Sequence, residues 1–125
     1  MNDALLRLVL ILIAAITVLS GLTQMVVPGF VLGMVAGTAD PLGSQLFATV
    51  GMFMLITGAL FLICLWRRST ETAVPFWIGV QKALAALFVA RAVFAGIFLP
   101  ISLGVASFDA LSAVLCFIFY WRSPR

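Results

Sequence analysis

The sequence predicts an all-α integral membrane protein, a four-helix antiparallel bundle with both termini in the cytoplasm. Of its 125 residues, 65% are hydrophobic and only 9% are charged, whereas a soluble domain carries roughly 45–50% apolar and about 25% charged residues. Four stretches with few charges are each long enough to cross a hydrocarbon layer about 30 Å thick, which takes roughly 20 residues. This composition excludes a soluble monomer, a disordered chain and a disulfide scaffold.

The first span covers residues 8–27 and contains no charge. Pro28 and Gly29 end it. A secretory signal has a core of roughly 7–15 residues and a small-residue cleavage pattern after it. This stretch is longer and no A-x-A pattern follows it. We therefore expect a retained anchor, although Arg7 precedes it.

Residues 28–43 are too rich in glycine and too short for another span. We expect an outer loop on the membrane surface, with room for one helical turn. The regular spacing of Gly29, Gly33 and Gly37 leaves two interpretations, a helix-packing face or a flexible loop. The neighbouring prolines favour the loop.

The remaining spans cover residues 44–66, 74–99 and 101–121. Arg67 stops the second span. The third and fourth spans are separated only by Pro100, so they must form a tight antiparallel hairpin.

The arginines predict the orientation of the spans. With four spans, the N-terminus, the 67–73 link and the C-terminus share one side of the membrane. The opposite side holds Asp40 and no lysine or arginine. The side with the termini holds five arginines: Arg7, Arg67, Arg68, Arg122 and Arg125. Cytoplasmic loops carry such an excess. Large aromatic residues gather near the same boundary, as expected of an interfacial belt: Trp66, Trp77, Tyr120 and Trp121.

The chain lacks the residues of common metal, haem and hydrolase sites. It contains no histidine, which excludes a histidine-ligated haem and a Ser-His-Asp triad. Cys64 and Cys116 have no CxxC spacing and lie in the cytoplasmic halves of their spans, where a disulfide is disfavoured. We expect them to act as small apolar residues; a soft-metal site would need further ligands. The sequence thus predicts no metal, no cofactor and no enzymatic activity.

Arg91 and Asp109 are predicted to form an ion pair inside the membrane. Each lies nine residues from Pro100, so a hairpin turn at Pro100 brings both to the same depth, roughly 13 Å from its end. Ser112 lies one helical turn beyond Asp109 and can donate to it. Such a pair either fixes the register of the two helices or responds to protons and ions. The structural interpretation is the stronger one.

Lys82 is expected to lie apart from that pair. It precedes Arg91 by nine residues, which is half a turn of helix, so the two side chains point to opposite faces. We expect Lys82 to reach toward the cytoplasmic surface, with contact to a lipid phosphate or to an acidic partner residue as the alternative.

Small residues predict the packing of the second and third spans. The third span is rich in alanine, including Ala86 and Ala90, and the second offers Gly51 and Gly58 as a matching groove. Small side chains let membrane helices approach closely, so we expect these four residues to form the interface between the two spans.

Several short motifs resemble a known group of proteins. They are PGFVLG at residues 28–33, PLG at 41–43, VG at 50–51 and TG at 57–58, followed by two arginines. The pattern resembles the DoxX-like group of small bacterial four-helix membrane proteins. The resemblance implies a fold in the bacterial inner membrane and no functional residue. Small multidrug exporters are similar in length, but they depend on an acidic residue in their first span, and residues 8–27 contain none.

Residues 1–125 are therefore expected to form one transmembrane domain. The predicted function is that of a non-catalytic accessory or scaffold protein, which assembles with itself or with a larger membrane complex. One alternative is an oligomeric carrier for a small solute or ion that uses Arg91 and Asp109. A weaker alternative is the binding of a lipid or another hydrophobic ligand. The expected partners are membrane lipids and membrane proteins. Nucleic acid is not expected, because the orientation rule explains the arginines.

Overall fold

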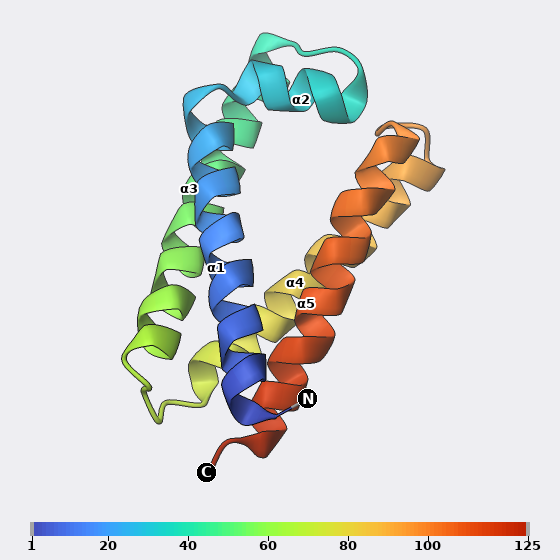
Figure 1. Ribbon diagram of the computed structural model, residues 1–125. Coiled ribbons are helices and arrows are strands. Elements are labelled where there is room, and N and C mark those ends of the chain that lie inside the picture. The colour runs from blue at the N-terminus through green and yellow to red at the C-terminus, as the bar shows by residue number, and fades with distance from the viewer. Residues whose placement is uncertain (1, 125) are drawn as a thin grey trace.

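The computed structural model describes residues 2–124 and contains helices joined by short links (Figure 1). The elements are α1 (Asp3–Val26), α2 (Pro28–Ala36), α3 (Pro41–Trp66), α4 (Ala73–Phe94), a short 3-10 turn η1 (Pro100–Ser102) and α5 (Leu103–Arg122). Four helical segments are long and apolar enough to cross a membrane: α1, α3, α4 and η1 with α5. The predicted all-α class and its four apolar spans are confirmed. Arg125, counted above among the cytoplasmic arginines, lies outside the described residues.

The segment after α1 is a helix, so the prediction of a loop over residues 28–43 is wrong for most of its length. Pro28 stands at the start of α2, and Gly37 ends it with a positive φ of 87°. Proline is favoured at the first position of a helix, where its missing N–H costs nothing, and glycine accepts the left-handed conformation at the end. Pro41 opens α3 in the same way. The two prolines begin helices here rather than break them.

The long helices form two antiparallel hairpins (Figure 1). α1 packs mainly against α3, and α4 packs mainly against α5, while fewer contacts join one hairpin to the other. The two hairpins lie close together at the end that holds both termini, and they diverge toward α2 (Figure 1). The link between α3 and α4 lies at the same end as the termini.

Two glycines set the close approach within the first hairpin. A Cβ atom on Gly21 would lie 2.7 Å from the carbonyl oxygen of Gly51, and one on Gly51 would lie 2.7 Å from that of Gly21. Gly58 lies against Thr17 and Val18. Gly51 and Gly58 therefore face α1, not α4 as the sequence predicted.

Ala86 and Ala90, predicted to pack against these glycines, are half-buried on α4. Most helix contacts of α4 are with α5. The predicted interface between the second and third spans is therefore wrong, because small residues on two spans do not by themselves identify which spans pack together.

The apolar core lies where the two hairpins meet, toward the end that holds the termini. It contains residues from all four long helices: Leu6, Leu10, Ile13, Ala14, Phe61, Leu65, Ile78 and Cys116. Cys116 is fully buried among them, which agrees with its predicted use as a small apolar residue.

A second connection between the hairpins lies at the opposite end. The Leu99 N–H donates to the carbonyl oxygen of Val35 at 2.7 Å, which ties the tip of the second hairpin to α2. The rings of Phe47 and Phe98 meet edge to face, with centroids 6.4 Å apart. α2 and Phe47 of α3 thus connect the first hairpin to the link that follows α4.

The contact between Gly21 and Gly51 predicts a sharp effect of one added methyl group. Gly51→Ala should lower the free energy of unfolding by about 1–3 kcal/mol, because its Cβ would meet the backbone of α1 and force the helices apart. Thermal unfolding in detergent micelles measures this. The control is Gly104→Ala on α5, where nothing lies within 4 Å of the new Cβ. Equal losses for both variants would contradict the close approach.

Candidate functional site

The charged centre of the molecule is an ion pair between α4 and α5. The Nζ atom of Lys82 lies 3.3 Å from Oδ1 of Asp109, and their side chains are only 9% and 12% exposed. Lys82 is nine residues, or about 13 Å, from the first residue of α4. The pair therefore lies well inside a segment that is apolar enough to cross a membrane.

A third helix contributes to the same site through Thr17 of α1. The Lys82 ammonium donates to Thr17 Oγ1 at 2.7 Å. The Thr17 hydroxyl donates in turn to the carbonyl oxygen of Ile13 at 2.9 Å. Because the hydroxyl proton is directed back to α1, the oxygen lone pairs remain available to accept from Lys82. The Phe108 ring also faces the ammonium, with its centroid 5.4 Å away.

α3 contributes to the same region through the neutral side chain of Thr57. Gln81 Nε2 on α4 donates to Thr57 Oγ1 on α3 at 3.3 Å. Side chains of Thr17, Thr57, Gln81 and Lys82 line a cavity of about 10 Å³ between the hairpins, which is close to the space that one water molecule needs. The site holds polar groups from all four spans but has no room for a solute.

The predicted pair of Arg91 with Asp109 is wrong, as is the expectation that Lys82 lies apart from the acid and reaches the surface. Asp109 pairs with Lys82, while Arg91 is exposed in the last turn of α4. The inference that Lys82 and Arg91 point to opposite faces was correct. The Lys82 side chain lies on the face of α4 that packs against α5.

The position of the hairpin turn explains the error. α4 ends at Phe94, and Gly96 follows with a φ of 76°. The N–H of Ile97 donates to the Ala92 carbonyl at 2.8 Å, and that of Gly96 donates to the Val93 carbonyl at 3.1 Å. This is the Schellman pattern that ends helices at glycine.

With this turn, residues 82 and 109 are equally distant from the chain between Ala95 and Gly96. A turn centred on Pro100, as the sequence analysis assumed, brings residue 91 opposite residue 109 instead. Gly96, followed four residues later by Pro100, was the signal in the sequence that would have located the end of the helix.

Other side chains near the pair make local contacts. Ser112 was expected to donate to Asp109, but its hydroxyl donates to the carbonyl oxygen of Phe108 at 2.7 Å. Hydroxyls on membrane helices often satisfy themselves in this way.

Arg7 has a structural role that was not predicted from the sequence. Its Nη1 donates to the Leu65 carbonyl oxygen at 2.9 Å, and its guanidinium lies 5.3 Å from the centre of the Phe119 ring. Arg7 thus connects α1 to the C-terminal end of α3 and contacts Phe119 on α5. Nearby, Arg122 forms an exposed ion pair with Asp3 at 3.3 Å.

The described part of the chain contains no cluster of side chains that could bind a metal ion. Within residues 2–124, no three or more His, Cys, Asp or Glu side chains lie together in a group that could hold a metal ion. The chemistry available at the site is that of a lysine, a carboxylate and hydroxyl groups.

Comparisons of the chain with protein family models, curated proteins and solved structures find no match. The resemblance to the DoxX-like group therefore stays a prediction.

The ion pair predicts a non-additive pattern of stability. Lys82→Met should destabilise the protein by about 3–5 kcal/mol, because it leaves the Asp109 carboxylate buried without its cation. Asp109→Leu should be harmful for the converse reason. The double variant Lys82→Met/Asp109→Leu should recover most of the loss, since it removes both charges. Unfolding of the micelle-bound protein by titrated SDS measures all three.

Arg91→Gln serves as the charge-matched control for this series. Its side chain is exposed, so the free energy of unfolding should change by less than about 0.5 kcal/mol. A double variant as unstable as the sum of its single variants would contradict the direct pairing of Lys82 with Asp109.

Proposed function

We propose that this protein is a non-catalytic integral membrane protein, an accessory or scaffold subunit that assembles with itself or with a larger membrane complex. The observation that carries the proposal is that the buried charges are satisfied by the chain itself. Lys82 bonds to Asp109 and Thr17, and the cavity beside it has a volume of only about 10 Å³. An interior of this kind holds helices together and leaves no space for a substrate.

The outer faces of the long helices support an assembly role. They carry large apolar side chains at helical spacing, for example Leu111, Val114 and Ile118 on α5. In a bilayer such faces meet lipid or other helices, and association depends on close packing rather than on hydrophobic burial. The chain offers these faces on both hairpins, which suits a protein whose partners lie in the membrane.

The proposed orientation places both termini in the cytoplasm, in a bacterial inner membrane. Supporting this, Arg7 lies near the start of α1, Arg67 and Arg68 directly follow α3, and Arg122 is the last residue of α5. These helix ends lie at the end that holds the termini (Figure 1). Arg91 lies in the last turn of α4, toward the opposite end. The excess of positive charge still favours the end of the termini as the cytoplasmic one.

A second candidate is an oligomeric carrier for a small solute or ion, with Lys82 and Asp109 in place of Arg91 and Asp109. One observation favours it: the polar groups around the small cavity lie between two hairpins that make few contacts with each other. Ionisable groups inside membranes frequently mark transport pathways. A carrier of this kind would have to separate the hairpins to admit its solute.

The assembly proposal predicts a defined complex. Native mass spectrometry of the protein, extracted in polymer-bounded discs from its own membrane, should show a single oligomer or a stoichiometric complex with another membrane protein. The Lys82→Met/Asp109→Leu variant should give the same complex, because the proposed contacts lie on the outer faces. A monomer without protein partners at all extraction strengths would overturn the proposal.

The carrier alternative predicts a different result for the same double variant. In proteoliposomes loaded with a pH-sensitive dye and exposed to ion gradients, the wild-type protein should accelerate flux, whereas the double variant should return it to the rate of empty liposomes. Arg91→Gln should keep the wild-type rate. Equal flux for the wild type and the double variant would exclude a role of the pair in transport.

A further inference from the structure

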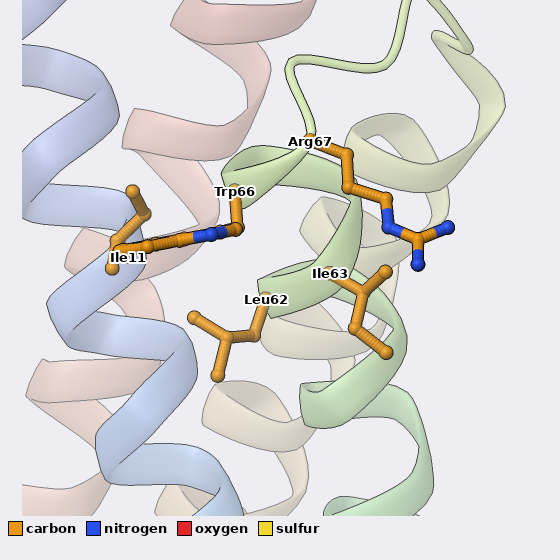
Figure 2. A pocket seen from close by; sticks show the side chains of 5 residues that line it. All are labelled: Ile11, Leu62, Ile63, Trp66 and Arg67. Atoms are coloured by element: carbon orange, nitrogen blue, oxygen red, sulfur yellow. The ribbon is translucent and has the colours of Figure 1, made fainter.

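A groove on the outer surface of α1 and α3 lies beside the C-terminal end of α3. It has a volume of about 370 Å³ and is lined by Ile11, Leu62, Ile63, Trp66 and Arg67. The groove shares no lining residue with the small cavity at Lys82. Figure 2 shows its five side chains: three lie on α3, Arg67 directly follows this helix, and Ile11 lies on the neighbouring α1.

The groove has a polar end and an apolar remainder. Arg67 follows the last residue of α3 and forms the polar end. Leu62 and Ile63 lie one turn further into the span, where the helix is apolar. The ring of Trp66 extends toward Ile11 (Figure 2), and this side chain is 74% exposed. Tryptophan at a span end prefers the depth of the lipid headgroups.

The N–H donors of the Arg67 guanidinium are available for a ligand. Within residues 2–124, the structure records no hydrogen bond or ion pair of this side chain to another residue. At the end of α3, the carbonyl oxygen of Leu65 accepts a hydrogen bond from Arg7 and not from Arg67. The nearest acid in sequence, Glu71, accepts a hydrogen bond from the Ala73 N–H at 2.9 Å. Arg67 therefore presents a planar set of five donors with no protein acceptor.

We propose that this groove binds one anionic phospholipid, with the phosphate on Arg67 and an acyl chain along Leu62 and Ile63. A guanidinium fits phosphate oxygens in a bidentate geometry. The volume of the groove lies in the range typical of small-ligand sites, about 300–1,000 Å³. Basic residues at this depth attract anionic headgroups, and the neighbouring Arg68, which does not line the groove, provides a matched control.

The two parts of the groove make different contributions. Apolar contacts gain little from hydrophobic burial, because the competing lipid tails are equally apolar. They select an occupant by shape. The discrimination between headgroups comes from the charge at Arg67. The site stands apart from the proposed assembly, since a protein with no partner can still bind a lipid here.

The test is a titration of the detergent-purified protein with phosphatidylglycerol or phosphatidylethanolamine, followed by native mass spectrometry. The wild type should bind one phosphatidylglycerol about fivefold more tightly than one phosphatidylethanolamine. Arg67→Gln should remove this preference, whereas Arg68→Gln should change the affinity less than twofold. The absence of a preference in the wild type would overturn the proposal. Equal losses in both variants would show only a general attraction to surface charge and would overturn it as well.

A second pair of variants tests the apolar part. Ile63→Trp should fill the groove and weaken the binding of both lipids by at least threefold. Leu60→Trp is the matched control, because Leu60 and Ile63 lie on the same helix and are each 53% exposed, but Leu60 does not line the groove. Circular dichroism verifies that both variants keep their helices. Equal effects of the two substitutions would locate the lipid elsewhere.

Discussion

The Lys82 ammonium is held inside an apolar layer, and the register of the helices depends on satisfying it. An unpaired charge at this depth costs several kcal/mol. Asp109 must therefore reach the same level on α5, which requires the hairpin to turn near Gly96 rather than at Pro100. Thr17 must also approach, which brings the first hairpin against the second. One cation thus specifies the position of three helices, and the Schellman turn at the end of α4 satisfies the same requirement locally.

The forces within each hairpin differ from those between the hairpins. α1 and α3 approach until the backbones of Gly21 and Gly51 nearly touch, an arrangement in which van der Waals contact dominates. Between the hairpins, specific polar contacts are prominent: Lys82 with Thr17, Gln81 with Thr57, and Leu99 with Val35. A bilayer provides no hydrophobic drive for helices to associate. These few polar bonds, together with the core near the termini, therefore determine how the two halves of the molecule are arranged.

The sequence was sufficient for the class and for the four spans, because length and hydropathy are local properties. It also placed Lys82 and Arg91 correctly on opposite faces, since helical periodicity alone decides that. It failed for the partner of Asp109, because pairing depends on the residue at which the chain turns. The turn was placed at Pro100, whereas α4 ends before Gly96, which has a positive φ of 76°. It failed likewise for α2, which was predicted as a loop because of its prolines and glycines. Pro28 starts this helix and Gly37 ends it.

The positions of the cations separate two uses of positive charge in this chain. Lys82 points inward and is neutralised by Asp109, so the pair brings no net charge into the apolar layer. Arg67 follows the last residue of α3 and Arg91 lies in the last turn of α4, and both are exposed. A long side chain at either position can reach lipid phosphate. Membership of one helix does not distinguish these uses, because Lys82 and Arg91 both lie on α4. The face of the helix distinguishes them. Which face packs against α5 depends on the residue at which the chain turns between α4 and α5. Lys82 and Asp109 therefore neutralise each other inside the fold, and the exposed Arg67 is the cation on which our lipid-binding proposal rests.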